Sequence, residues 1–171
     1  MVALKGEEMS FDLEILVNGG KKITPMVIDK IRIEVNPRNC GRCYYKDTFP
    51  YMTEKKGAWC TLFEIDKEHR IFSAMNIADI NLIPESEIKY PFWTDKTSGM
   101  YVLKIVDEYY HSFKKVLKKL QELSPKKRIM FLPRLEGGEY NNVCGVITLN
   151  DFFELLDNKR ILFNIVYIIQ N

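Results

Sequence analysis

The sequence predicts an α+β fold, with a mixed and mostly antiparallel sheet on which two helices pack. Three observations support this class. The first half holds short segments of alternating apolar and polar residues, the middle holds one long amphipathic segment, and the last thirty residues follow a strand-helix-strand pattern. At 171 residues we expect a single domain over 1–171, with residues 1–10 disordered.

The first strand is predicted at Phe11–Val17, where the apolar residues alternate with polar ones. This alternation is typical of a strand that is buried on one face only. Asn18-Gly19-Gly20 follows and favours a sharp turn, because these residues accept positive φ angles. A second strand is expected within Met26–Val35, and Pro37 ends it because proline cannot donate to a β-ladder.

A hairpin is predicted from Trp59 to Met75. Residues 59–65 and 71–75 are apolar runs joined by the charged turn 66–70, a length common in hairpins. The segments 36–57 and 84–98 contain prolines and aromatic residues without a regular period. Long irregular connections within a domain are often functional, so we interpret both as loops that carry function.

The longer helix is predicted at about 99–123. Its apolar residues recur at spacings of four and three, which places them along one face of a helix: Val102, Val106, Tyr109, Phe113, Val116, Leu120 and Leu123. Thr97 and Ser98 are the candidate N-caps. Ser124-Pro125 is expected to end the helix.

The C-terminal part predicts three further strands and a short helix. Residues 128–132 form a strand that Pro133 is expected to end, and 136–142 form a loop. A strand at 143–148, a helix at about 149–157 and a strand at 161–169 follow. Because residues 161–169 are mostly β-branched or aromatic, we expect a central strand covered on both faces.

Composition excludes several classes of protein. The formal net charge is +2, whereas proteins dedicated to nucleic acid are usually more basic. Lys5, Glu7 and Glu8 interrupt any apolar signal segment, and the longest apolar run, broken by Asn164, is far shorter than the roughly twenty residues of a membrane helix. We therefore expect a cytoplasmic protein without a membrane partner.

The four cysteines suggest reduced thiols rather than a disulfide framework. Cys40 and Cys43 form a CxxC pair, which supplies half of a tetrahedral zinc site. Cys60 and Cys144 stand alone in the sequence, and the residues around the pair are typical of a loop. Structural thiols are the preferred interpretation, while a zinc-stabilised enzyme built around Cys40/Cys43 and a redox pair remain alternatives.

Other catalytic patterns do not stand out. The two histidines, His69 and His111, belong to no metal-binding or triad pattern, and the Gly19-Gly20 and Gly137-Gly138 pairs lack the spacing of a phosphate-binding loop. We therefore expect no catalytic residues, no cofactor, no metal and no small-molecule substrate.

The lysine cluster has two interpretations. Lys114, Lys115, Lys118 and Lys119 lie on one side of the predicted helix. They would suit phosphate groups, as in an accessory protein that binds nucleic acid. They would equally suit water and the C-terminal end of the helix dipole, and we prefer this second interpretation because the chain as a whole is not basic.

Aromatic and acidic residues gather in the predicted loops and are the candidates for binding a protein partner, because such residues are enriched at interfaces. The candidate set is Tyr44, Tyr45, Trp93, Asp95, Glu136, Glu139 and Tyr140. Some of them would equally cover the edges of the core.

The C-terminal pattern at 145–156 and 161–169 resembles bacterial immunity proteins, which neutralise a cognate toxin of a contact-dependent growth inhibition or polymorphic toxin system. The resemblance covers about the last third of the chain. It implies a non-catalytic protein that occludes the active site or substrate surface of a toxin, expected to be a nuclease. Immunity proteins against nucleases are often acidic, whereas this chain carries a slight positive charge.

Overall fold

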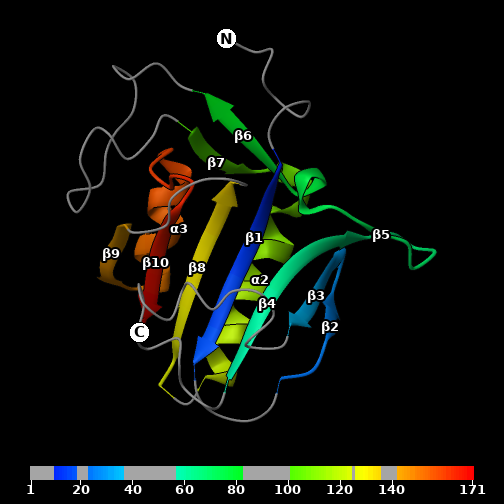
Figure 1. The fold of residues 1–171 in the computed structure, drawn as a ribbon, viewed down its shortest axis with the longest axis horizontal. Helices are drawn as coiled ribbons and strands as arrows, with labels where there is room; N and C mark the ends of the chain where they lie inside the picture. Colours follow the sequence, from blue (N-terminus) through cyan, green and yellow to red (C-terminus); the bar gives the residue numbers. More distant parts are fainter. Residues whose placement is uncertain (1–9, 19–22, 37–56, 83–100, 125, 136–141) are drawn as a thin grey trace.

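The computed structural model describes residues 10–18, 23–36, 57–82, 101–124, 126–135 and 142–171. In this part of the chain an eight-stranded mixed sheet and a two-stranded sheet pack with two α-helices (Figure 1). Among the described strands, only one pair of neighbours, β9 with β10, is parallel. The predicted α+β class and the mostly antiparallel sheet are confirmed.

The large sheet has the strand order β2-β3-β4-β1-β8-β10-β9. The eighth strand, β5, pairs with β4 and is not part of this order. Its strands are β1 (Phe11–Asn18), β2 (Met26–Ile28), β3 (Ile31–Asn36), β4 (Gly57–Ile65), β5 (Ile71–Phe72), β8 (Arg128–Leu135), β9 (Asn142–Ile147) and β10 (Ile165–Gln170). The C-terminal strand β10 therefore lies between two neighbours, as its apolar sequence predicts.

The first strand lies in the middle of the sheet rather than at a half-exposed position. Phe11, Leu13, Ile15 and Val17 face the helices, as their alternation predicts. However, Leu16 and Glu14 on the opposite face are also buried. The expectation of a half-buried strand is wrong because alternation shows which residues share a face, whereas neighbouring strands and chain segments decide how far each face is covered.

The hairpin predicted from Trp59 to Met75 is present, whereas the single strand expected within Met26–Val35 is two strands, β2 and β3. β2 and β3 pair antiparallel around a turn in which Asp29 has a φ angle of 51°. β4 and β5 also pair antiparallel, with Glu64 opposite Phe72 and Ile65 opposite Ile71. The second strand of that hairpin is shorter than expected, because Ser73 caps a 3-10 turn, η2 (Ala74–Asn76), by accepting the main-chain N–H of Met75.

The predicted helix at 99–123 is corrected at its N-terminal end. Residues Tyr101–Ile105 form a strand, β7, which pairs antiparallel with β6 (Ala78–Leu82). Helix α2 (Asp107–Leu123) begins after Val106, which makes no side-chain capping bond. The candidate N-caps Thr97 and Ser98 lie outside the described residues, in any case well before this helix begins.

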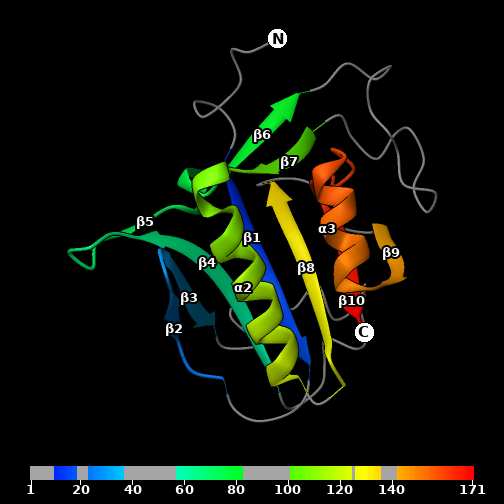
Figure 2. The ribbon, with the colours of Figure 1, turned by 180° about the vertical axis from the view of Figure 1, so that it is seen from behind.

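Helix α2 packs its apolar face on the large sheet, and Ser124 ends it as predicted. Helix α3 (Leu149–Asp157) lies beside it on the same face (Figure 2). Aromatic rings join the two helices to the sheet. The Phe131 ring lies 5.6 Å from that of Phe113 and 5.3 Å from that of Phe152, in edge-to-face geometry.

Helix α3 follows its predicted bounds because Thr148 and Asp151 form a capping box at its N-terminus. The Thr148 hydroxyl accepts the main-chain N–H of Asp151, and the Asp151 carboxylate accepts that of Thr148. These two bonds satisfy N–H groups that have no partner within the first helical turn.

The last strand begins at Ile165 rather than Ile161, because Asn164 turns the chain with a φ angle of 64°. Before this turn, Leu162 forms a bridge with Val102 of the small sheet. The Asn164 main-chain N–H donates to the Pro133 carbonyl oxygen over 2.7 Å, and its side chain accepts the N–H of Leu135 over 2.8 Å. Residues 161–163 thus join the two sheets.

Pro133 does not end its strand, contrary to the prediction, since β8 continues to Leu135. Pro133 pairs with Leu13 of β1, and the last paired residues of β8 and β10 are Phe131 and Tyr167. The carbonyl oxygen of Pro133 accepts the N–H of Asn164, which lies beyond the β8–β10 ladder. Because an antiparallel residue directs its N and C=O to the same side, the missing N–H removes no bond of either ladder.

The two faces of the large sheet differ. Both α-helices described by the structure lie on one face, which we call the helix face (Figure 2). The other face is covered by neither of the described helices, and we call it the helix-free face for that reason. It carries a second buried apolar cluster: Leu16, Trp59, Met130, Leu132, Val166 and Ile168. Neither helix of the described part is long and apolar enough to span a membrane.

Candidate functional site: charged rows on the helix-free face

All seven residues predicted to bind a partner lie outside the described residues, and so do Cys40 and Cys43 of the CxxC pair. The seven are Tyr44, Tyr45, Trp93, Asp95, Glu136, Glu139 and Tyr140. Their role stays a prediction. A candidate site within the described chain must therefore be built from other residues.

Charged side chains gather on the helix-free face, across β3, β4, β1 and β8. We define the charged rows as Asp12, Glu14, Arg32, Glu34, Thr61 and Arg134. They share one face because side chains alternate along a strand, and their neighbours Leu13, Ile33, Leu62 and Phe131 belong to the cluster beneath the helices.

The strand register sets these residues in two adjacent rows. Glu34 lies opposite Thr61, and Thr61 lies opposite Glu14. In the next row, Arg32 lies opposite Phe63, and Asp12 lies opposite Arg134. Directly opposed residues of antiparallel strands have Cβ atoms about 4.5–5.5 Å apart, so Asp12 and Arg134 come into contact although they are distant in sequence. In the other row, Thr61 separates Glu34 from Glu14.

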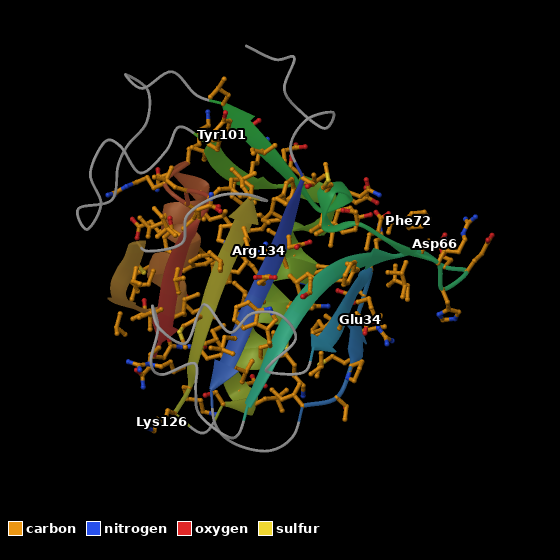
Figure 3. All side chains as sticks on the ribbon, viewed as in Figure 1. Glu34, Asp66, Phe72, Tyr101, Lys126 and Arg134 are labelled. Carbon is orange, nitrogen blue, oxygen red and sulfur yellow. The ribbon has the colours of Figure 1, made fainter. Side chains whose placement is uncertain are left out.

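Arg134 forms ion pairs with two carboxylates. Its Nη2 atom lies 2.7 Å from Oδ2 of Asp12, and its Nε atom lies 3.4 Å from Oε2 of Glu14. A separate pair joins Nε of Arg32 to Oε1 of Glu34 over 2.9 Å. Figure 3 labels Arg134 in the middle of the sheet and Glu34 nearer the β4–β5 side.

Burial differs sharply within the charged rows. The Glu14 side chain is 1% exposed, whereas those of Asp12 and Glu34 are 40% and 33% exposed. Burial disfavours the charged form of a carboxylate, and a guanidinium in ion-pair contact offsets part of that cost. Among the described residues of the rows, three carboxylates lie near two guanidinium groups, and the partly exposed carboxylate side chains are those of Asp12 and Glu34.

Two of the four lysines of the predicted cluster make contacts within the protein. Lys114 lies over the rings of Tyr110 and Phe153, 4.8 Å and 5.0 Å from their centroids, and so connects the two helices. Lys115 pairs with Asp29 over 3.1 Å. Lys118 and Lys119 are exposed, and within the described residues no ion pair involves them.

His69 and the two described thiols occupy structural positions, and His111 lies on the surface. His69 occupies the β4–β5 turn with a φ angle of 64°, and His111 is exposed on α2. Burial raises the pKa of the Cys60 thiol and that of the Cys144 thiol to about 12, so both are neutral at physiological pH. In the described part of the chain no three metal-binding side chains come together.

Sequence reasoning missed the charged rows. The sequence signal that could have indicated them is the set of polar residues that alternate with apolar ones in these strands, at positions 12, 14, 32 and 34. On the sequence alone, this alternation indicates a strand that is buried on one face only. The pairing of Asp12 with Arg134, 122 residues later, depends on the strand order and has no local signature.

Comparisons of the chain with models of known protein families, with curated proteins and with solved structures give no match. The candidate site therefore rests on its own geometry.

Proposed function

We propose that this chain is a non-catalytic binding protein of the immunity type, which neutralises a cognate bacterial toxin by covering its active site or its substrate surface. The observation that carries the proposal is the pair of charged rows, with the partly exposed carboxylates of Asp12 and Glu34 beside buried Glu14. The expected partner is a nuclease.

A nuclease suits this surface because an enzyme that binds the phosphate backbone presents Lys and Arg side chains around its active site. Exposed carboxylates attract such a surface and speed up association, even where the inhibitor as a whole is not acidic. The slight positive charge of the whole chain is therefore compatible with a local acidic contact. Inhibition would be stoichiometric and would involve no turnover.

The proposal expects a toxin gene next to the gene for this chain, and the test uses the toxin domain that such a gene encodes. Wild-type protein is mixed with that domain, and both the binding affinity and the residual nuclease activity are measured at two salt concentrations. We expect inhibition that is complete near one inhibitor per toxin and an affinity that falls as salt rises. Undiminished nuclease activity in the presence of an excess of inhibitor would refute the proposal.

A matched pair of variants locates the contact. Asp12→Asn combined with Glu34→Gln removes the two partly exposed carboxylates of the charged rows. Glu122→Gln combined with Glu154→Gln removes two exposed carboxylates from the helix face and serves as the control. We expect the first pair to weaken binding by about tenfold or more and the control pair to leave it near wild type.

Nucleic-acid binding is a second candidate function, favoured by the exposure of Lys118 and Lys119. The informative variant is Lys118→Glu with Lys119→Glu, because Lys115 pairs with Asp29 and its substitution would also remove an ion pair within the protein. If this function holds, a labelled oligonucleotide binds the wild type with a steep salt dependence and binds the variant more weakly. The toxin-binding proposal expects no oligonucleotide binding at physiological salt.

A further inference from the structure

The β4–β5 hairpin extends beyond the body of the large sheet (Figures 1 and 2). Its second strand consists of Ile71 and Phe72, whose exposed fractions are 50% and 38%. Among the described residues, large apolar side chains with this much exposure otherwise occur at Val27 and Val146. Two adjacent exposed apolar residues on a projecting hairpin suit contact with a protein.

The turn of this hairpin is held in one conformation by Asp66. Its Oδ1 atom accepts the main-chain N–H groups of Glu68 and Arg70, each over 2.9 Å. Its Oδ2 atom accepts from Nε of Arg70 over 2.7 Å. A segment that is already ordered loses little conformational entropy when it binds, so more of the contact free energy remains as affinity.

The base of the hairpin is fixed as well. The Glu64 carboxylate accepts from the hydroxyl of Tyr109 on α2 and from the side-chain amide of Asn76 in η2. These bonds connect β4 to the helix and to the turn after β5. The base of the projecting hairpin is therefore fixed to the rest of the protein by these hydrogen bonds.

The register of the hairpin places its two apolar residues on opposite faces. Ile71 lies opposite Ile65, and Ile65 shares its face with Phe63 and Thr61 because they alternate along β4. Ile71 is therefore on the helix-free face, one row beyond the row of Arg32 and Phe63. Phe72 lies opposite Glu64 on the helix face, where the Arg70 guanidinium lies 5.9 Å from its ring centroid.

We propose that Ile71 is the apolar anchor of the same partner-binding surface as the charged rows. This inference rests on the proposed function and specifies the partner's chemistry. The toxin surface should present basic side chains to Asp12 and Glu34 and, one row beyond that of Asp12, an apolar pocket to Ile71. Interfaces commonly combine a desolvated apolar anchor with charges that steer association.

The test compares three serine substitutions in the full chain, with affinity for the adjacent-gene toxin domain as the readout. Ile71→Ser removes the proposed anchor. Phe72→Ser alters the same hairpin on its other face, and Val146→Ser alters an exposed apolar residue on β9, at the far edge of the sheet. Circular dichroism and thermal unfolding of each variant verify that the fold is retained.

We expect Ile71→Ser to weaken binding by about tenfold or more, mainly through faster dissociation. Val146→Ser and Phe72→Ser should bind within about threefold of wild type, since a difference of that size is small for an interface contact. Wild-type affinity in a folded Ile71→Ser variant overturns this inference and leaves the proposed function standing. A wild-type chain that fails to bind the toxin overturns both.

Ile71→Leu provides a second variant that is certain to keep the hairpin apolar. Affinity close to wild type for Ile71→Leu, together with a loss for Ile71→Ser, supports an apolar anchor. An equal loss in Ile71→Leu, Ile71→Ser and Phe72→Ser points to general disturbance of the hairpin and contradicts a specific role for Ile71.

Discussion

Nε of Arg134 lies 3.4 Å from Oε2 of Glu14, in the middle of the large sheet, where the Glu14 side chain is 1% exposed. The same guanidinium reaches Asp12 over 2.7 Å through Nη2. One cation therefore connects a buried carboxylate to a partly exposed one. This arrangement makes the charged rows a structural element of the sheet as well as a candidate binding surface.

The first prediction is that Arg134→Met destabilises the protein by about 3–5 kcal/mol, because it removes the guanidinium from a buried carboxylate. The matched control is Arg32→Met, which removes a guanidinium from the 33% exposed Glu34 and should change stability by about 0–1 kcal/mol. Urea denaturation of the three proteins gives the free energies of unfolding.

A combined Glu14→Leu and Arg134→Met variant sharpens this prediction. Replacing both members of a buried ion pair by apolar residues is often neutral or stabilising, so the combined variant should be more stable than Arg134→Met alone. Equal stabilities of Arg134→Met and Arg32→Met would contradict the structural role given to Arg134.

The second prediction concerns the pH dependence of the β4–β5 turn. Hydrogen bonds from the main chain and the side chain of Arg70 lower the pKa of Asp66 below its ordinary value of 3.8. A carboxylate with a lowered folded pKa stabilises the folded form above its unfolded pKa, and this contribution disappears as the pH falls through the folded value. The turn should therefore stay ordered from neutral pH down to about 4 and loosen below that.

The measurement is the amide chemical shifts of Glu68 and Arg70 during an acid titration. In wild type both amides should shift together at a pH below 3.8, the ordinary value for aspartate. Asp66→Asn keeps an acceptor oxygen but cannot titrate, so the matching transition should vanish in that variant. A transition of the same midpoint in Asp66→Asn would show that another group controls the turn.

The third prediction concerns the buried thiols. In a Cys40→Ser and Cys43→Ser variant, only Cys60 and Cys144 remain. Because burial raises the pKa of each to about 12, both should resist an aromatic disulfide reagent at pH 8 in the native protein and react fully after unfolding. Rapid reaction of either thiol in the native state would contradict this prediction.

Local patterns in the sequence identified most elements because the relevant physics is local. Alternation in residues 11–17 and 31–35 reflects the two faces of a strand, and the turn at 66–70 is short enough to define a hairpin. Helix α3 was predicted with its observed bounds, since its apolar face and its cap lie within a few residues of each other.

The wrong boundary at Tyr101–Ile105 has a different cause. Val102 and Val106 are four residues apart, which fits a helix, but Val102 also fits a strand because it is β-branched. The pairing of β7 with β6 and the bridge from Val102 to Leu162 decide the outcome. Both contacts involve residues distant in sequence, which local periodicity does not register.

The charged rows could not be predicted for the same reason, because they depend on contacts between residues distant in sequence. Asp12, Glu34 and Arg134 each look like ordinary polar positions within their own strands. Only the strand order β3-β4-β1-β8 brings them into adjacent rows. The seven candidate partner-binding residues in the predicted loops, among them Tyr44 and Tyr140, follow from the composition of those loops instead. Their role remains a prediction to be tested by substitution.

The fourth prediction concerns Asn164, which connects the small sheet to β10. Its φ angle of 64° is strained for most residues, while asparagine and glycine adopt it more readily. Its side chain also accepts the N–H of Leu135 over 2.8 Å. Asn164→Ala removes both advantages and should destabilise the protein by about 2 kcal/mol or more.

Asn164→Gly separates the two contributions. Glycine relieves the backbone strain but lacks the acceptor, so this variant should lie between wild type and Asn164→Ala, about 1 kcal/mol above the alanine variant in unfolding free energy. Thermal and urea unfolding provide the measurement. If alanine and glycine are equally destabilising, backbone strain at Asn164 has no part in starting β10, and the lost side-chain bond accounts for the whole effect.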